Sequence, residues 1–183
     1  MSNTAYANNH DYYIYFQHIA SGIIATFKAF ITDFDDQYTS DWNDVKVYGR
    51  MDPISTFQGT SRVINFSFDV IAEDVEEALI NFENSRRLIQ CLYPVYEEIG
   101  AGNFSATSIQ APPLMKIRFA NLIQGGLGST IDGGLVGKLD GVSYKPEFEA
   151  GVFEKTGDGQ ILPKLNRFSC NFTVFHTDKL GFS

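Results

Sequence analysis

The spacing of the apolar residues changes once near residue 73, and this change constrains the fold more than any other feature of the chain. In residues 62–71, apolar side chains alternate with mostly polar ones, and the apolar set is Ile64, Phe66, Phe68 and Val70. A period of two is typical of a strand with one buried face. After residue 73, apolar residues recur at helical spacing, at Val75, Leu79, Phe82, Ile89 and Leu92. The sequence therefore predicts a strand followed by a helix that packs on the apolar face of that strand through Leu79 and Phe82.

The predicted helix has clear signals at both of its ends. Asp74 can accept hydrogen bonds from the first free backbone N–H groups, and Glu77, three residues later, completes a capping-box-like start. Pro94 cannot continue a helix, so the helix should end near Tyr93. The stretch 42–94 is the part of the chain around which we expect the rest to be organised.

The remaining chain has mainly strand signals, and we predict one domain over residues 1–183. The other predicted strands cover residues 12–16, 23–32, 114–122, 139–150 and 165–176. In the last strand Phe172 is expected to point into the core. We expect a flexible arm at residues 1–10, an acidic polar loop at 33–44 and a glycine-rich loop at 125–141. The predicted fold class is mainly β with one packed α-helix.

Composition excludes some classes of protein. The net charge of −8 argues against a general nucleic-acid binder, which needs a basic surface. We expect no signal peptide, because residues 1–9 are polar. We expect no membrane partner either, since no run reaches the roughly 18–20 apolar residues that a spanning helix needs. The two cysteines, Cys91 and Cys170, are not spaced as a metal or redox pair and are expected to be buried thiols.

A search for chemistry finds no catalytic motif, no cofactor motif and no metal-ligand spacing among the three histidines. Asp33, Asp35 and Asp36 could hold a hard cation, but a solvated acidic loop is the favoured interpretation. The glycines at 125–128 lack the lysine of a P-loop. We therefore predict no catalytic, cofactor-binding or metal-binding residues, and no enzyme.

Several segments together resemble a known family. They are VYGRMDPISTFQGTSRVINFSFDV, RRLIQCLYPVY, APPLMKIRFANLI, GLVGKLDGVSYKPEFEAGVF and LPKLNRFSCNFTVFH, within residues 42–176. They are similar to the tail-tube-like baseplate hub proteins, the tube initiators, of contractile-tailed bacteriophages. The strongest elements are the GR-x-DP turn, the strand and helix after it, and the LYP end of that helix. The candidate subunit-contact or turn residues are Trp42, Tyr48, Gly49, Arg50, Asp52 and Pro53.

The resemblance implies a rolled β-barrel or sandwich with one helix, in a homohexameric ring that nucleates the tail tube. Its partners would be further copies of itself and other baseplate hub and tail tube proteins. DNA would pass through the lumen without specific binding, in a virion assembled in the host cytoplasm. A weakly repulsive acidic wall suits that role.

Other interpretations stay open at this point. The chain could be an ordinary tail tube subunit or a tail terminator, or, in a different class, a β-barrel that binds a small ligand. A hydrolase with an unfamiliar site is a further alternative. For the GR-x-DP turn, we predict that Arg50 pairs with a carboxylate, either in its own chain or in a neighbouring subunit; the competing interpretation is an exposed arginine.

Overall fold

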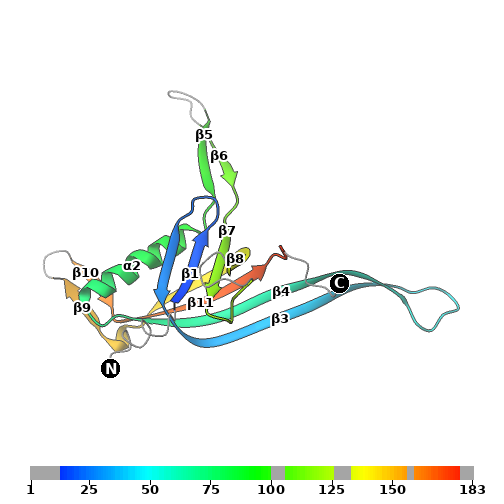
Figure 1. Ribbon diagram of the computed structural model, residues 1–183, viewed down its shortest axis with the longest axis horizontal. Helices are drawn as coiled ribbons and strands as arrows, with labels where there is room; N and C mark the ends of the chain where they lie inside the picture. The colour runs from blue at the N-terminus through cyan, green and yellow to red at the C-terminus, as the bar shows by residue number, and fades with distance from the viewer. Residues whose placement is uncertain (1–12, 100–105, 126–132, 156–158, 178–183) are drawn as a thin grey trace.

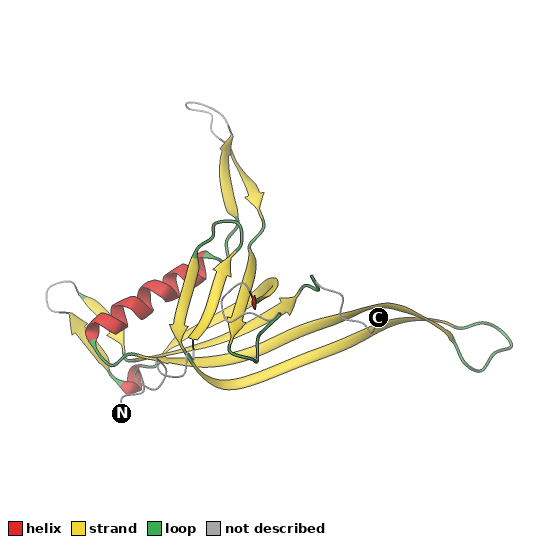
Figure 2. Ribbon diagram, in the orientation of Figure 1, coloured by secondary structure: helices red, strands yellow, loops and turns green. Residues whose placement is uncertain are grey.

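The computed structural model describes residues 13–99, 106–125, 133–155 and 159–177. Within these ranges the chain is mainly β with a single α-helix, as predicted (Figures 1 and 2). An antiparallel seven-stranded sheet has the order β2-β1-β7-β8-β11-β4-β3. Its strands are β1 (Tyr13–His18), β2 (Ile24–Lys28), β3 (Phe30–Val45), β4 (Ile54–Ile71), β7 (Leu114–Phe119), β8 (Leu135–Pro146) and β11 (Leu165–Val174).

Two small hairpins extend from this sheet. One joins β5 (Val95–Ile99) to β6 (Ala106–Ala111), and the other joins β9 (Val152–Lys155) to β10 (Gln160–Pro163). A 3-10 turn, η2 (Phe148–Ala150), lies between β8 and β9. Figure 1 shows the β5–β6 hairpin pointing away from the body, whereas the β9–β10 hairpin lies beside the helix.

The seven-stranded sheet rolls over so that its two halves face each other. Phe27 of β2 lies 5.2 Å, ring to ring, from Phe168 of β11, although three strands separate them in the sheet order. Phe16 of β1 is likewise 6.3 Å from Phe66 of β4. Only Ala29 separates the two edge strands, β2 and β3, along the chain. The end of β2 therefore lies next to the start of β3.

The core lies between the two halves of the rolled sheet. The predicted core residues of strands are all buried: Ile64, Phe66, Phe68, Val70 and Phe172. Stacked phenylalanines dominate the core; Phe68 and Phe168, for example, lie 5.0 Å apart with nearly parallel rings. Aromatic pairs of this kind add about 0.5–1.5 kcal/mol each beyond the burial of their area.

Helix α2 (Val75–Gln90) begins where the sequence predicts. The Asp74 carboxylate accepts from the Glu77 N–H at 2.7 Å, and the Glu77 carboxylate accepts from the Glu73 N–H at 2.9 Å. Lys28 of β2 also contacts Glu77, with 3.0 Å between Nζ and Oε1. This capping box and ion pair fix the start of α2 against the end of β2.

The face that α2 buries differs from the predicted one. Its buried residues are Ala78, Asn81, Ser85 and Leu88. Phe82 is 45% exposed, so its assignment to the core is wrong. Leu79 is only partly buried and packs on a small cluster with Ala72 and Leu162, apart from the main core. At about 100° per residue, the apolar stripe lies roughly 100° around the helix from the buried face.

Two predicted loops are strands instead. The acidic segment 33–44 lies inside β3, because it pairs residue by residue with β4. Of the predicted glycine-rich loop, residues 135–141 belong to β8. Gly137 is required there, since a Cβ would collide with the carbonyl oxygen of Thr173 and with the Phe172 ring. The predicted flexible arm at 1–10, and residues 126–132 of the loop, lie outside the described residues.

Both cysteines are free and buried, as predicted. Burial raises the pKa of the Cys170 thiol to about 12 and also raises the pKa of Cys91. Because the thiolate is the reactive form, neither cysteine should react readily while the chain is folded.

We expect Phe68→Ala to lower the free energy of unfolding by about 3–5 kcal/mol, because Phe68 is fully buried among four other phenylalanine rings. Chemical denaturation monitored by circular dichroism measures the loss. Ser67→Ala is the control, since Ser67 is the neighbour on the opposite face of β4, and it should stay within about 0.5 kcal/mol of the wild type. Equal stability of the two variants would contradict this account of the core.

Candidate assembly surfaces

The most prominent feature of the molecule is a two-stranded arm, residues 38–60, formed by the far halves of β3 and β4 (Figure 1). The other strands of the sheet do not accompany these halves, so both faces of the arm are open to solvent. Large apolar side chains are nevertheless exposed on it: Tyr38, Trp42, Val45, Val47, Tyr48, Met51, Ile54 and Phe57. A long, exposed and apolar hairpin is a surface that soluble chains normally cover.

A charged cluster fixes the base of the arm. The Arg62 guanidinium donates to both carboxylate oxygens of Asp36, at 3.0 and 2.7 Å, and lies 5.1 Å from the centre of the Tyr38 ring. The side chains of Arg62 and Asp36 are 15% and 20% exposed, so water screens this pair only partly. The hydrogen bond to Asp36 raises the pKa of Arg62, which stays charged. The cluster holds the two strands together where they leave the core.

The middle of the arm has one aromatic face. Trp42 and Phe57 are directly paired across β3 and β4, with ring centres 5.2 Å apart in an edge-on arrangement. By alternation along β3, Trp42 is on the same side as Phe34, which packs against the main core. A partner that docks on Trp42 and Phe57 would therefore extend the core side of the sheet outward.

The tip of the arm carries most of the predicted contact residues. Gly49 has a φ of +86°, in the left-handed region that favours glycine, and Tyr48 is fully exposed beside it. Arg50, Asp52 and Pro53 follow in the same turn. Arg50 is exposed, and no carboxylate pairs with it among the described residues, so the predicted ion pair within the chain is wrong. A pair with a neighbouring subunit stays a prediction.

The outward face of the rolled sheet is polar and has few charges at its centre. Ser67, Ser169 and Ser143 form one row across β4, β11 and β8, and the Ser67 hydroxyl donates to that of Ser169 at 3.2 Å. Asn65 and Asn171 form the next row. Charged side chains appear at the rim, where Arg167 lies 3.5 Å from Asp69 and 3.4 Å from Glu147. This surface, here called the polar sheet face, offers hydroxyl and amide groups without a concentrated charge.

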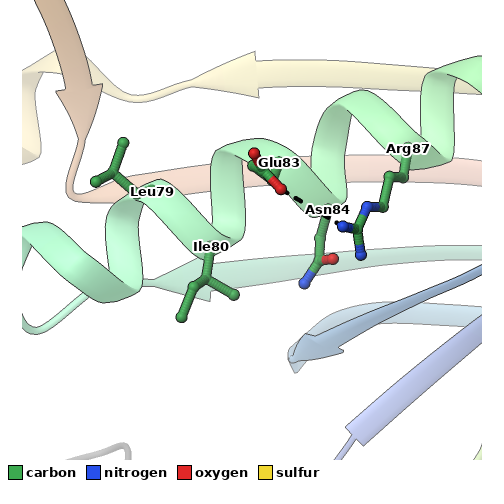
Figure 3. Close-up of a pocket in the computed structure, with 5 residues that line it drawn as sticks. All are labelled: Leu79, Ile80, Glu83, Asn84 and Arg87. Atoms are coloured by element: carbon green, nitrogen blue, oxygen red, sulfur yellow. Dashed lines mark hydrogen bonds and ion pairs between the residues drawn. The ribbon is translucent and has the colours of Figure 1, made fainter.

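Helix α2 presents a second apolar surface. The apolar stripe consists of Val75, Leu79, Phe82 and Ile89, and of these Val75, Phe82 and Ile89 are exposed. Next to it is a groove of about 410 Å³, lined by Leu79, Ile80, Glu83, Asn84 and Arg87. Figure 3 shows Leu79 and Ile80 pointing to opposite sides of the helix, with the Glu83–Arg87 ion pair further along the helix toward its C-terminal end. The groove has one helix as its wall and is open to solvent, so it is an open surface groove rather than an enclosed pocket.

Sites for other chemistry are not apparent in the parts of the chain that the structure describes. No group of three or more His, Cys, Asp or Glu side chains is placed to hold a metal ion there. By strand alternation Asp36 lies on the opposite face of β3 from Asp33 and Asp35, and Asp36 is engaged by Arg62. No described helix combines the length and the apolar character needed to cross a bilayer.

Comparison with models of known protein families finds no match, and comparison with curated protein sequences finds none either. Functional assignment therefore depends on the surfaces of the chain and on its resemblance in sequence.

Sequence reasoning identified the tip of the arm but missed its shaft, because residues 33–44 lack an apolar alternation. The available signal for a strand was the even spacing of two aromatic residues, Tyr38 and Trp42, which places both on one face of a strand. For α2 periodicity found the stripe, but the helix ends at Gln90, before the predicted end near Tyr93, so Leu92 is not part of it. Periodicity also does not tell whether a stripe faces its own core or a partner.

We expect Arg62→Gln to loosen the base of the arm, because it removes two charge-assisted hydrogen bonds from a partly buried carboxylate. The free energy of local opening should fall by about 1–2 kcal/mol, seen as faster amide hydrogen exchange in residues 38–45 and 54–61. Arg87→Gln is the control, since its ion pair with Glu83 is exposed and should contribute little. Unchanged exchange in the arm of Arg62→Gln would contradict a structural role for the cluster.

Proposed function

We propose that this chain is a structural subunit of a contractile phage tail, a baseplate hub protein that closes a hexameric ring and initiates the tail tube. The sequence resemblance to tube initiators suggests the class. The observation that carries the proposal is the arm, because it combines exposed aromatic residues with a rigid base and reaches far from the core. A monomer gains nothing from such a structure, whereas a neighbouring subunit would bury it.

Open strand edges also support assembly. Within the described residues, neither β2 nor β3 has a strand on its outer side. An exposed edge presents unpaired N–H and C=O groups that another chain can pair with. Because the two edges are different surfaces, edge-to-edge contact between copies is heterologous and closes into a ring when the rotation allows. The rolled sheets of neighbouring subunits would then form one continuous barrel.

The polar sheet face is suited to line the channel of such a ring. Its central serines and asparagines offer DNA no cluster of cations, and the chain as a whole carries a charge of −8. A wall whose centre offers no cations to neutralise phosphates does not hold DNA tightly. DNA, or a tape-measure protein before it, would pass along this face without specific binding.

The alternative of a β-barrel that binds a small ligand is less well supported. The interior between the two halves of the sheet is filled by fully buried side chains, among them Phe16, Phe27, Phe68 and Phe168. The hollows on the polar sheet face, of about 210 and 430 Å³, are on its outer surface. An ordinary tube subunit or a tail terminator would share the surfaces described above, and the position of the chain in the particle separates these roles.

Cryo-electron microscopy of the native tail or baseplate tests the proposal directly. We expect six copies of this chain in one ring at the start of the tube, with the polar sheet face toward the lumen. The particle is the right sample, because an initiator should wait for its platform before it assembles. A map in which the chain lies outside any ring, or in which another protein alone lines the lumen, would overturn the proposal.

Replacing residues 41–59 with Asn-Gly tests the role of the arm. The two-residue turn joins Ser40 to Thr60, which already pair across the strands, and so preserves the contact between Thr60 O and His176 Nε2. We expect a folded body with nearly unchanged unfolding, because the deleted residues are almost all exposed. We also expect loss of incorporation into particles, measured by complementation. Normal incorporation of the shortened chain would show that the arm is dispensable.

A further inference from the structure

We infer that the apolar stripe of α2 is the docking site for the arm of a second copy of this chain, with the tip of the arm at the N-terminal end of the helix. The inference rests on the proposed function, and it names the two surfaces through which neighbouring copies meet. Both surfaces are apolar and exposed in one copy, so each lacks the partner that the other could supply.

The two surfaces cannot meet within one copy. Figure 1 shows α2 at one end of the long axis of the molecule and the tip of the arm at the opposite end. A contact between them must join different copies, and it joins two different patches. Such a heterologous contact repeats from copy to copy until it closes a ring or continues as a helix. It therefore suits an assembly of many subunits better than a simple dimer.

The dimensions of the two surfaces agree. The helix has 16 residues, which corresponds to roughly 24 Å at 1.5 Å per residue. Within β3 the arm advances five positions from Ser40 to Val45, or roughly 17 Å at about 3.3 Å per residue, and the turn at residues 46–53 continues beyond Val45. The aromatic pair of Trp42 and Phe57 can thus lie against one end of the stripe while the turn reaches the other end.

Charge sets the direction of docking. The N-terminal end of α2 is acidic, with Glu73 and Glu76 exposed, and the C-terminal end carries Arg86 and Arg87. The arm has the complementary order. Its tip carries Lys46 and Arg50 against one acid, Asp52, and its shaft carries Asp41 and Asp44 with no basic residue. Placing the tip beside Glu73 and Glu76 puts the acidic shaft beside the two arginines, and it gives Arg50 a carboxylate partner in the neighbouring subunit.

Disulfide trapping between two variants that each carry one introduced cysteine tests the contact and its direction. The matched pairs are Ser40→Cys with Gln90→Cys, and Met51→Cys with Glu76→Cys; the swapped pairs are Ser40→Cys with Glu76→Cys, and Met51→Cys with Gln90→Cys. Each pair is mixed at high concentration and oxidised mildly, and a size tag on one variant identifies the mixed dimer. The native Cys91 and Cys170 are buried and should not interfere. We expect at least tenfold more mixed dimer from the matched pairs.

Two further variants test the stripe itself. Adding Phe82→Ser to the helix partner should lower the matched yield at least tenfold, because Phe82 lies on the stripe. Ile80→Ser is the matched control, since Ile80 is equally apolar and exposed but points to another side of the helix, and it should leave the yield unchanged.

The outcomes separate this inference from the proposed function. Equal yields from matched and swapped pairs, or no mixed dimer, would overturn the arm–helix contact. The absence of a mixed dimer is also the result expected if the stripe binds a different tail protein. If the particle still contains a ring of this chain, the proposed function stands without the contact. If matched pairs form and the particle contains no such ring, the contact stands and the proposed function falls.

Discussion

The packing of phenylalanine rings between the two halves of the sheet is the interaction on which the rest of the structure depends. A flat sheet of seven strands would leave one whole face apolar and exposed. Contacts such as Phe27 with Phe168 and Phe16 with Phe66 bring β1 and β2 over β4 and β11 and remove that face from water. The two edge strands, β2 and β3, are joined through Ala29 alone. Each of them has an open outer side.

Strand β4 connects this core to the arm. Its second half supplies Ile64, Phe66, Phe68 and Val70 to the core, while its first half, beyond Arg62, has only β3 beside it. A two-stranded ribbon by itself is marginally stable in water, so the arm needs support at its base. The bidentate pair of Arg62 with Asp36 provides that support at the point where burial ends. The arm can therefore hold its direction while its aromatic residues stay exposed.

Helix α2 has one buried face and one exposed apolar stripe. It packs on the body through small and polar residues, with Leu88 as the large contribution to the core, and this leaves its apolar stripe outward. An apolar stripe kept in water is unfavourable unless a second molecule covers it. The same holds for Trp42 and Phe57 on the arm. Both features make sense physically when the chain is one part of an assembly rather than a complete structure by itself.

The sequence alone determined the fold class, the inward face of β4 and the start of α2, because each depends on local periodicity or on a cap within four residues. Only the tertiary structure decided that residues 33–44 are a strand, because their own pattern is polar. Their pairing partners, residues 55–67 of β4, lie beyond the turn of the hairpin. It also decided which face of α2 is buried. Periodicity reports that an apolar stripe exists, whereas the packing of Ala78 and Leu88 on the body fixes the rotation of the helix and turns Phe82 outward.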